Sequence, residues 1–160
     1  MARTAMFILS CAWALSAFSQ TGDVRDVSSI DGILDAYYEV VSGPAGERVD
    51  VARDQFLHHP DAWVAIAGKD AADNPFVNVM TLADYHGDNA PRTENFYERE
   101  TDRVVSRSGN MAHVWSSYES SLTPGGEPFT TGVNTITLFF DDERWWVMGW
   151  MFDASAGYED

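Results

Sequence analysis

The chain has 160 residues, of which 45% are hydrophobic and 13% aromatic, and its formal net charge is −15 at pH 7. This is more apolar bulk than a disordered acidic segment carries, and the length suits one domain with a core of its own. The charge disfavours binding to nucleic acid, whose phosphates it would repel, and it agrees with either simple solubility or attraction of cationic ligands.

The N-terminal segment differs from the rest of the chain. Arg3 gives a short positive start, residues 6–18 are almost wholly apolar, and no acidic residue precedes Asp23. This pattern is typical of a secretory signal peptide, and the small residues Ala17 and Ser19 fit cleavage after Ser19. We therefore predict a signal peptide at 1–19, a mature domain at 20–160, and a periplasmic or secreted location.

Three alternatives concern the same segment, of which a misassigned start codon is one. Cys11, the only cysteine, follows Ile8-Leu9-Ser10 and weakly resembles a lipoprotein cleavage site, but the apolar run continues past it through Leu15. An uncleaved anchor is the second alternative, although the run is short for a membrane span. Cleavage after Ser19 leaves no thiol, so no disulfide, cysteine metal site or cysteine nucleophile is expected.

Helical periodicity begins after this segment. Apolar residues recur at intervals of three and four from Ile30 to Val41, and Ser28 precedes Asp31 at the spacing of a capping box. The Gly- and Pro-rich segment 43–46 ends this helix, since neither residue extends a helix without cost. A second, shorter helix is predicted at 47–57.

Strands dominate the rest of the chain. After a turn at 58–61, the apolar run 62–67 is predicted as a strand, and the Gly-, Asn-, Asp- and Pro-rich residues 68–95 as a long surface connection with a short helix at 81–85. Four strands follow at about 96–107, 111–122, 130–140 and 144–153, separated by hairpin signals. Helices first and antiparallel strands afterwards indicate an α+β fold.

This element order resembles that of the nuclear transport factor 2-like superfamily. The segments YYEVVSGPAG (37–46), LHHPDA (57–62), AHVWSSYE (112–119) and RWWV (144–147) also resemble an uncharacterised bacterial, SnoaL-like family within it, over about residues 29–153. The resemblance implies a cone-shaped α+β fold, with N-terminal helices packed on a curved antiparallel sheet around an apolar pocket, and a homodimer through the outer sheet face. Members include isomerases, cyclases, dehydratases and binding modules, so no single activity is implied.

Alternation along the last three strands predicts which side chains face this pocket. We assign to the concave face the sets that give the more continuous apolar stripe, which are Ala112, Val114, Ser116 and Tyr118, then Gly132, Asn134, Ile136, Leu138 and Phe140, then Trp146, Met148, Trp150 and Phe152. Polar groups on an apolar wall must be hydrogen-bonded to the protein, to water or to a ligand. We therefore predict Tyr118, Asn134, Trp146 and Trp150 as ligand-binding residues, with ordinary core packing as the alternative.

The resemblance also suggests an acid/base site. Asp61 enters its strand at the pocket rim, where ketosteroid isomerases keep their catalytic carboxylate, and Tyr37 is placed to donate to a substrate oxygen. The second donor of such an isomerase falls at Ile136, which cannot donate, and Asn134 is an imperfect substitute. The catalytic candidates are therefore Asp61, His59 and Tyr37.

Neither a metal nor a cofactor is expected. His58 and His59 lie near Asp61, but neighbouring residues in extended chain point to opposite sides, and no third histidine lies at ligand spacing. Phosphate-loop and nucleophile-elbow patterns are absent from the sequence.

Two main functions remain open at this point, with a structural or partner-binding role as a further alternative. The first is an exported, non-catalytic module that holds a small apolar or aromatic molecule in the cone, and the second is a lyase- or isomerase-like enzyme that works in the same pocket. Trp115, Trp145, Val133, Val147 and Met151 fall in the outward set, which predicts a homodimer through the convex sheet face. Binding to nucleic acid and a membrane span are not expected.

Overall fold

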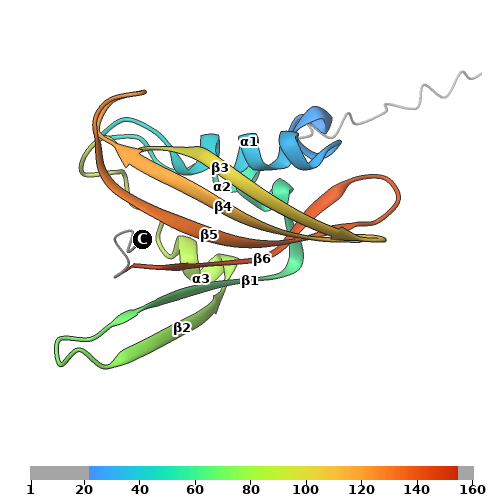
Figure 1. The fold of residues 1–160 in the computed structure, drawn as a ribbon. Helices are drawn as coiled ribbons and strands as arrows, with labels where there is room; N and C mark the ends of the chain where they lie inside the picture. Colours follow the sequence, from blue (N-terminus) through green and yellow to red (C-terminus); the bar gives the residue numbers. More distant parts are fainter. Residues whose placement is uncertain (1–21, 155–160) are drawn as a thin grey trace, which may run out of the picture.

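A curved, open sheet of six strands runs through the computed structural model, which describes residues 22–154 (Figure 1). The strands are β1 His58–Lys69, β2 Pro75–Thr81, β3 Tyr97–Ser108, β4 Met111–Ser121, β5 Pro128–Phe140 and β6 Trp145–Asp153. Their order is β2-β1-β6-β5-β4-β3, with β1 and β6 parallel and all other neighbours antiparallel. The predicted signal peptide at 1–19 and the alternative lipid site at Cys11 lie outside the described residues.

The helices are η1 Val24–Val27, α1 Ile30–Val41, α2 Val51–Leu57 and α3 Leu82–His86. α1 contacts β3 and β6, and α2 contacts β1 and β6, so both helices pack on the sheet. The predicted α+β cone and the meander of four antiparallel strands are confirmed, although the sheet is mixed because β1 runs parallel to β6. Within residues 22–154, no helix combines the length and apolar character that a membrane span requires.

The N-terminus of α1 differs by one residue from the predicted one. Ser29, not Ser28, caps the helix, because its hydroxyl oxygen accepts from the backbone N–H of Gly32 at 2.9 Å. The Ser28 hydroxyl instead donates to the carbonyl oxygen of Arg25 at 3.1 Å, within the preceding turn. The predicted inward face holds, since Ile33, Leu34 and their neighbours one turn on are buried.

α2 is shorter than the predicted helix at 47–57. Residues 47–50 are not helical. The Asn89 side chain occupies the backbone groups of Val49 instead, because it accepts from the Val49 N–H at 3.2 Å and donates to the Val49 carbonyl oxygen at 3.0 Å. The helix begins at Val51, after Asp50 accepts from the N–H of Arg53 at 3.0 Å.

The predicted connection at 68–95 contains a strand. β2 pairs with β1 through a turn in which the Asp70 carboxylate accepts from the N–H groups of Ala72 and Asn74, at 2.8 and 2.9 Å. The turn residues misled the prediction, while the short alternating run after Pro75 was overlooked. The predicted short helix is confirmed as α3, where Thr81 and Asp84 form a capping box.

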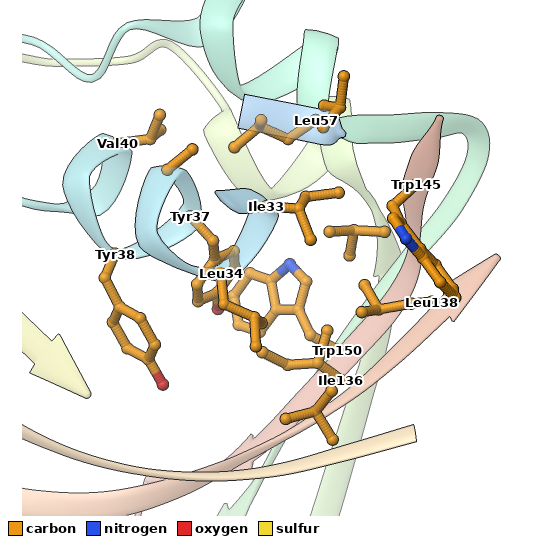
Figure 2. Close-up of a cluster of buried hydrophobic side chains, with 14 of the residues drawn as sticks. Ile33, Leu34, Tyr37, Tyr38, Val40, Leu57, Ile136, Leu138, Trp145 and Trp150 are labelled. Atoms are coloured by element: carbon orange, nitrogen blue, oxygen red, sulfur yellow. The ribbon is translucent and has the colours of Figure 1, made fainter. Parts of the chain in front are cut away.

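The core lies between α1, α2 and the concave sheet face (Figure 2). Its fully buried side chains include Ile33, Leu34, Leu57, Val114, Ile136 and Leu138. β1 begins at His58, where a turn was predicted, and its register with β6 shifts between His58 and Trp63, which accommodates Pro60.

A β-bulge in β6 decides which of its side chains face the core. Thr137 pairs with Gly149, but the next residue, Leu138, pairs with Val147, so β6 carries one extra residue here. One extra residue switches the faces of a strand. Trp150 and Phe152 face inward as predicted, whereas the predictions for the other end of β6 are wrong. Trp145 and Val147 lie in the core, with Trp145 beside Leu138 in Figure 2, and Trp146 lies on the opposite face.

Candidate functional site

A cavity of about 320 Å³ lies between α1, α3 and the concave face of β3 to β6. Its walls are mainly aromatic, formed by Tyr37, Tyr85, Phe96, Tyr118, Trp150 and Phe152. The remaining lining includes Val41, Ser120, Thr130, Thr131 and Asn134, with the carboxyl groups of Glu98 and Asp153. None of the lining residues is basic.

Trp150 is at the centre of the aromatic wall. Its ring stacks on Phe152, with centroids 5.7 Å apart and planes 18° from parallel. Two tyrosines meet it edge-on, Tyr37 from α1 at 5.8 Å and Tyr85 from α3 at 4.9 Å. Offset stacking and edge-on contacts are the favourable geometries for aromatic pairs, so these rings hold one another in place.

Tyr118 lies across a glycine of the neighbouring strand. A Cβ atom on Gly132 would come within 2.6 Å of the Tyr118 hydroxyl oxygen, which is closer than side chains approach. The lack of a side chain at Gly132 therefore lets the Tyr118 ring lie flat along the cavity wall.

Glu98 supplies a carboxyl group to this wall. Burial raises its pKa to about 7, although hydrogen bonds from Ser120 and Asn134 act in the opposite direction. The Ser120 hydroxyl donates to Oε2 at 3.0 Å. The backbone of Glu98 is fixed by Ser42 at the end of α1, whose hydroxyl oxygen accepts from the Glu98 N–H at 3.0 Å. The raised pKa therefore brings the titration of this carboxyl group toward neutral pH.

A hydrogen-bond chain leads from Asn134 to the Glu100 carboxylate on β3. The Asn134 amide donates to the Tyr38 hydroxyl at 3.2 Å, which is 2.6 Å from the Ser116 hydroxyl, and Ser116 donates to the Glu100 carboxylate. Arg103 donates to the same carboxylate at 2.6 Å. Because a carboxylate only accepts, each hydroxyl in turn must donate toward Glu100, and this fixes the Asn134 amide with its NH₂ group toward Tyr38.

Four of the predicted site residues meet in the cavity: Tyr37, Tyr118, Asn134 and Trp150. Trp146 does not, because the β6 bulge turns it to the opposite face. There its indole N–H donates to Asp141 at 2.7 Å, and the Arg144 guanidinium lies 3.7 Å from its ring centroid.

The predicted catalytic set is not assembled. The Asp61 side chain is 88% exposed, and its only close partner among the ion pairs of the described residues is His59, at 3.7 Å. His59 and Trp146 line a second pocket of about 480 Å³, together with Phe56, Pro60 and Leu82. Of the three candidates, only Tyr37 reaches the aromatic cavity.

Sequence reasoning missed Glu98, although a signal was present. Faces were assigned only for the last three strands, and the same alternation applied to 96–107 puts Phe96, Glu98 and Glu100 on one face. Glu98 therefore shares a strand face with the apolar Phe96, and this pattern indicates a carboxyl group that folding moves out of water.

A second group of ionisable residues, Asp54, His58 and His86, was also missed. The Asp54 carboxylate on α2 is 3.2 Å from Nδ1 of His58 and 2.8 Å from Nε2 of His86 on α3. Burial alone would raise the pKa of Asp54, but the two histidines beside the carboxylate outweigh it and lower that pKa to about 2. Nothing local in the sequence joins Asp54 to His86, because the docking of α3 brings them together.

Within residues 22–154, no three His, Cys, Asp or Glu side chains are arranged to hold a metal ion.

No protein-family model matches the chain, and no curated protein matches it. Among solved structures, the chain is similar to an NTF2-like protein of unknown function from Shewanella baltica OS155, with 14% identity, a TM-score of 0.49, and coverage of 82% of this chain and 92% of that one. It is also similar to an NTF2-like protein of unknown function from Methylobacillus flagellatus KT, with 23% identity, a TM-score of 0.46, and coverage of 81% and 99%. A third is provisionally described as a ketosteroid isomerase from Parabacteroides distasonis ATCC 8503, with 14% identity, a TM-score of 0.49, and coverage of 81% and 95%. These similarities concern the fold alone.

Proposed function

We propose that this protein is an exported small-molecule-binding protein that holds an apolar or aromatic molecule in the cavity around Trp150. One observation carries the proposal: the cavity of about 320 Å³ has six aromatic residues in its walls, with the partly buried carboxyl group of Glu98 among them. Ligand pockets are mostly apolar, with a few polar groups that set the orientation of the ligand.

Native purification followed by mass spectrometry of extracted small molecules tests this function. Displacement of a fluorescent apolar dye gives a second readout, with Asn134→Leu as the test variant and Thr135→Val as the matched control. Asn134 lines the cavity, whereas Thr135 is its neighbour on the other sheet face. We expect dye affinity to change several-fold in Asn134→Leu alone. Equal effects of the two substitutions, with no co-purified molecule, would contradict the proposal.

The alternative is a lyase- or isomerase-like enzyme that uses acid/base chemistry in the same cavity. The raised pKa of Glu98, about 7, favours it, because a general acid or base works best when its pKa is near the working pH. In this alternative Glu98 takes the role predicted for Asp61 or His59, and the hydroxyl groups of Tyr37 and Tyr118 donate to the substrate oxygen. Exchange of the α-protons of cyclopentanone in D₂O tests it: the enzyme should accelerate exchange and Glu98→Gln should not.

Export and dimerisation are further parts of the proposal. Intact-mass measurement of protein from the producing cell should show a mature chain that begins at Gln20, and a lipid attached at Cys11 would contradict it.

For the dimer, an outward-facing row crosses all six strands through paired positions: Val79, Ala65, Met151, Thr135, Trp115 and Val104. Trp115 is 51% exposed in this row, and burial of such a ring is a common source of interface stability. Light scattering should give a dimer for the wild type and a monomer for Trp115→Glu.

A further inference from the structure

The cavity walls combine aromatic rings with negative charge. Ring faces attract cations through their quadrupoles, and the attraction is strongest when both groups are out of water. Glu98 and Asp153 add carboxyl groups to the same walls, and no lining residue is basic. An anion would therefore meet repulsion in this cavity, in a chain whose net charge is already −15.

Nearby arginines do not neutralise Glu98. Arg103, on the same strand, is bound to Glu100 and Asp31, with a distance of 2.8 Å to the latter. Arg92 donates to the carbonyl oxygens of Val41 and Ser42, at 3.0 and 3.1 Å. The carboxyl group in the cavity therefore has hydrogen-bond donors, Ser120 and Asn134, but no ion pair with either arginine.

We infer that the ligand of this cavity is an organic cation, an ammonium ion with an aromatic or apolar body, held by the rings around Trp150 and by the Glu98 carboxylate. The inference rests on the proposed function, because it names the ligand class for the same cavity. The ammonium group pairs with the Glu98 carboxylate, which has no ion pair with Arg92 or Arg103, while the apolar body of the ligand packs on the rings. Steering by the negative field of the chain adds to the rate of association.

Binding of a cation is coupled to the protonation of Glu98. The groups that line the cavity together with Glu98 are Tyr37 from α1, Tyr85 from α3, Tyr118 and Ser120 from β4, Asn134 from β5 and Asp153 from β6. Tyr38 from α1 and Glu100 from β3 lie farther along the hydrogen-bond chain that starts at Asn134. In this set the carboxyl group with a pKa raised to about 7 is that of Glu98. A cation favours the ionised carboxylate, so its affinity should rise with pH through about 7, and binding below that pH should release a proton.

Calorimetry with three probes of similar shape tests the inference: benzyltrimethylammonium, its neutral isostere neopentylbenzene, and the anion phenylacetate. We expect the cation to bind, with proton release near pH 6.5, and the anion not to bind. Glu98→Gln should weaken cation binding about tenfold or more without weakening binding of the neutral probe. Glu94→Gln, an exposed acidic position with the same change in charge, should leave both affinities unchanged.

A second variant keeps the test open if Glu98→Gln does not fold. Tyr85→Leu retains apolar bulk at the cavity mouth but removes a ring, so the cation should lose affinity by more than the neutral probe. Binding of neopentylbenzene without binding of the cation would overturn the inference and leave the proposed function standing. Absence of binding by all three probes would count against both.

Discussion

Two carboxyl groups, Asp54 on α2 and Glu98 on β3, are largely removed from water, and folding shifts their pKa values in opposite directions. Asp54 is 6% exposed at its side chain and has a pKa lowered to about 2, while Glu98 in the cavity has a pKa raised to about 7. Both groups lose water, so burial by itself raises both values. The difference comes from the partners: two histidines approach Asp54, and only a hydroxyl and an amide approach Glu98.

This comparison separates a structural group from a binding group. At Asp54 the fold itself supplies the partners, and the cluster joins α2, β1 and α3. At Glu98 the fold supplies a cavity instead, so the carboxyl group is destabilised when ionised unless a partner comes from outside. Both pKa values are perturbed, but only Glu98 combines the perturbation with a place in the cavity wall, and for this reason we place the site at Glu98 rather than at Asp54.

The largest expected effect is on the free energy of unfolding, and its sign is opposite for substitutions at Asp54 and at Glu98. Asp54→Asn should lower the free energy of unfolding by about 3 kcal/mol at pH 7, because it removes a buried charge whose partners remain. Glu98→Gln should not lower it and should raise it above pH 7, because a neutral amide needs no ionic partner. Urea denaturation measures both, with the exposed Asp61→Asn as a control that stays within about 0.5 kcal/mol. Equal losses at both positions would break the comparison.

The pH dependence of the unfolding free energy gives a sharper test of the difference between Glu98 and Asp54. The folded-state pKa of Glu98 is raised from 4.5 to about 7, so the folded state binds its proton more tightly than the unfolded state does. The contribution of Glu98 to the unfolding free energy is therefore at its full value below about pH 4.5. It falls by roughly 3 kcal/mol as pH rises to about 7. Unfolding free energies measured across this range should therefore fall less steeply in Glu98→Gln than in the wild type. Parallel curves would show that Glu98 remains solvated.

Asp54 should produce the reverse slope at acid pH. Its folded-state pKa is depressed from 3.8 to about 2, so the stabilisation is present above the unfolded value and is lost as pH falls toward 2, by about 2 kcal/mol. Acid titration of the unfolding free energy should show this loss in the wild type. Asp54→Asn, which has no titrating group, should lack it.

The smallest expected effect is that of a substitution at His86, and it tests whether the aromatic cavity depends on the cluster of Asp54, His58 and His86. His86 and Tyr85 are neighbours on α3, with His86 bound to Asp54 and Tyr85 in the cavity wall. His86→Gln weakens one contact of the cluster, which should cost about 1 kcal/mol and reduce dye affinity a few-fold through displacement of Tyr85. An unchanged dye affinity at the same stability cost would mean that the cavity does not depend on the cluster.

Local patterns accounted for most of the fold. The periodicity of α1, the Thr81–Asp84 capping box and the hairpin signals between β3 and β6 all depend on residues close in sequence, and each of these elements was predicted. β2 was missed because its run of apolar residues is short and follows a turn-rich segment.

The candidate site was predicted only where strict alternation holds. Tyr118, Asn134 and Trp150 lie on regular stretches of their strands, and all three line the cavity. Trp146 lies beyond the bulge, whose extra residue has no local signature in the sequence. Asp61 was proposed from the resemblance, and the structure exposes its side chain to solvent.

Titration of the Glu98 carboxyl carbon by NMR tests the central claim most directly. In the free protein we predict a midpoint near pH 7, and in the presence of saturating benzyltrimethylammonium a midpoint at least about one pH unit lower, because the bound cation stabilises the carboxylate. A midpoint near 4.5 in the free protein, or the same midpoint with and without the cation, would contradict the account of Glu98 as a buried carboxyl group that takes its partner from a ligand.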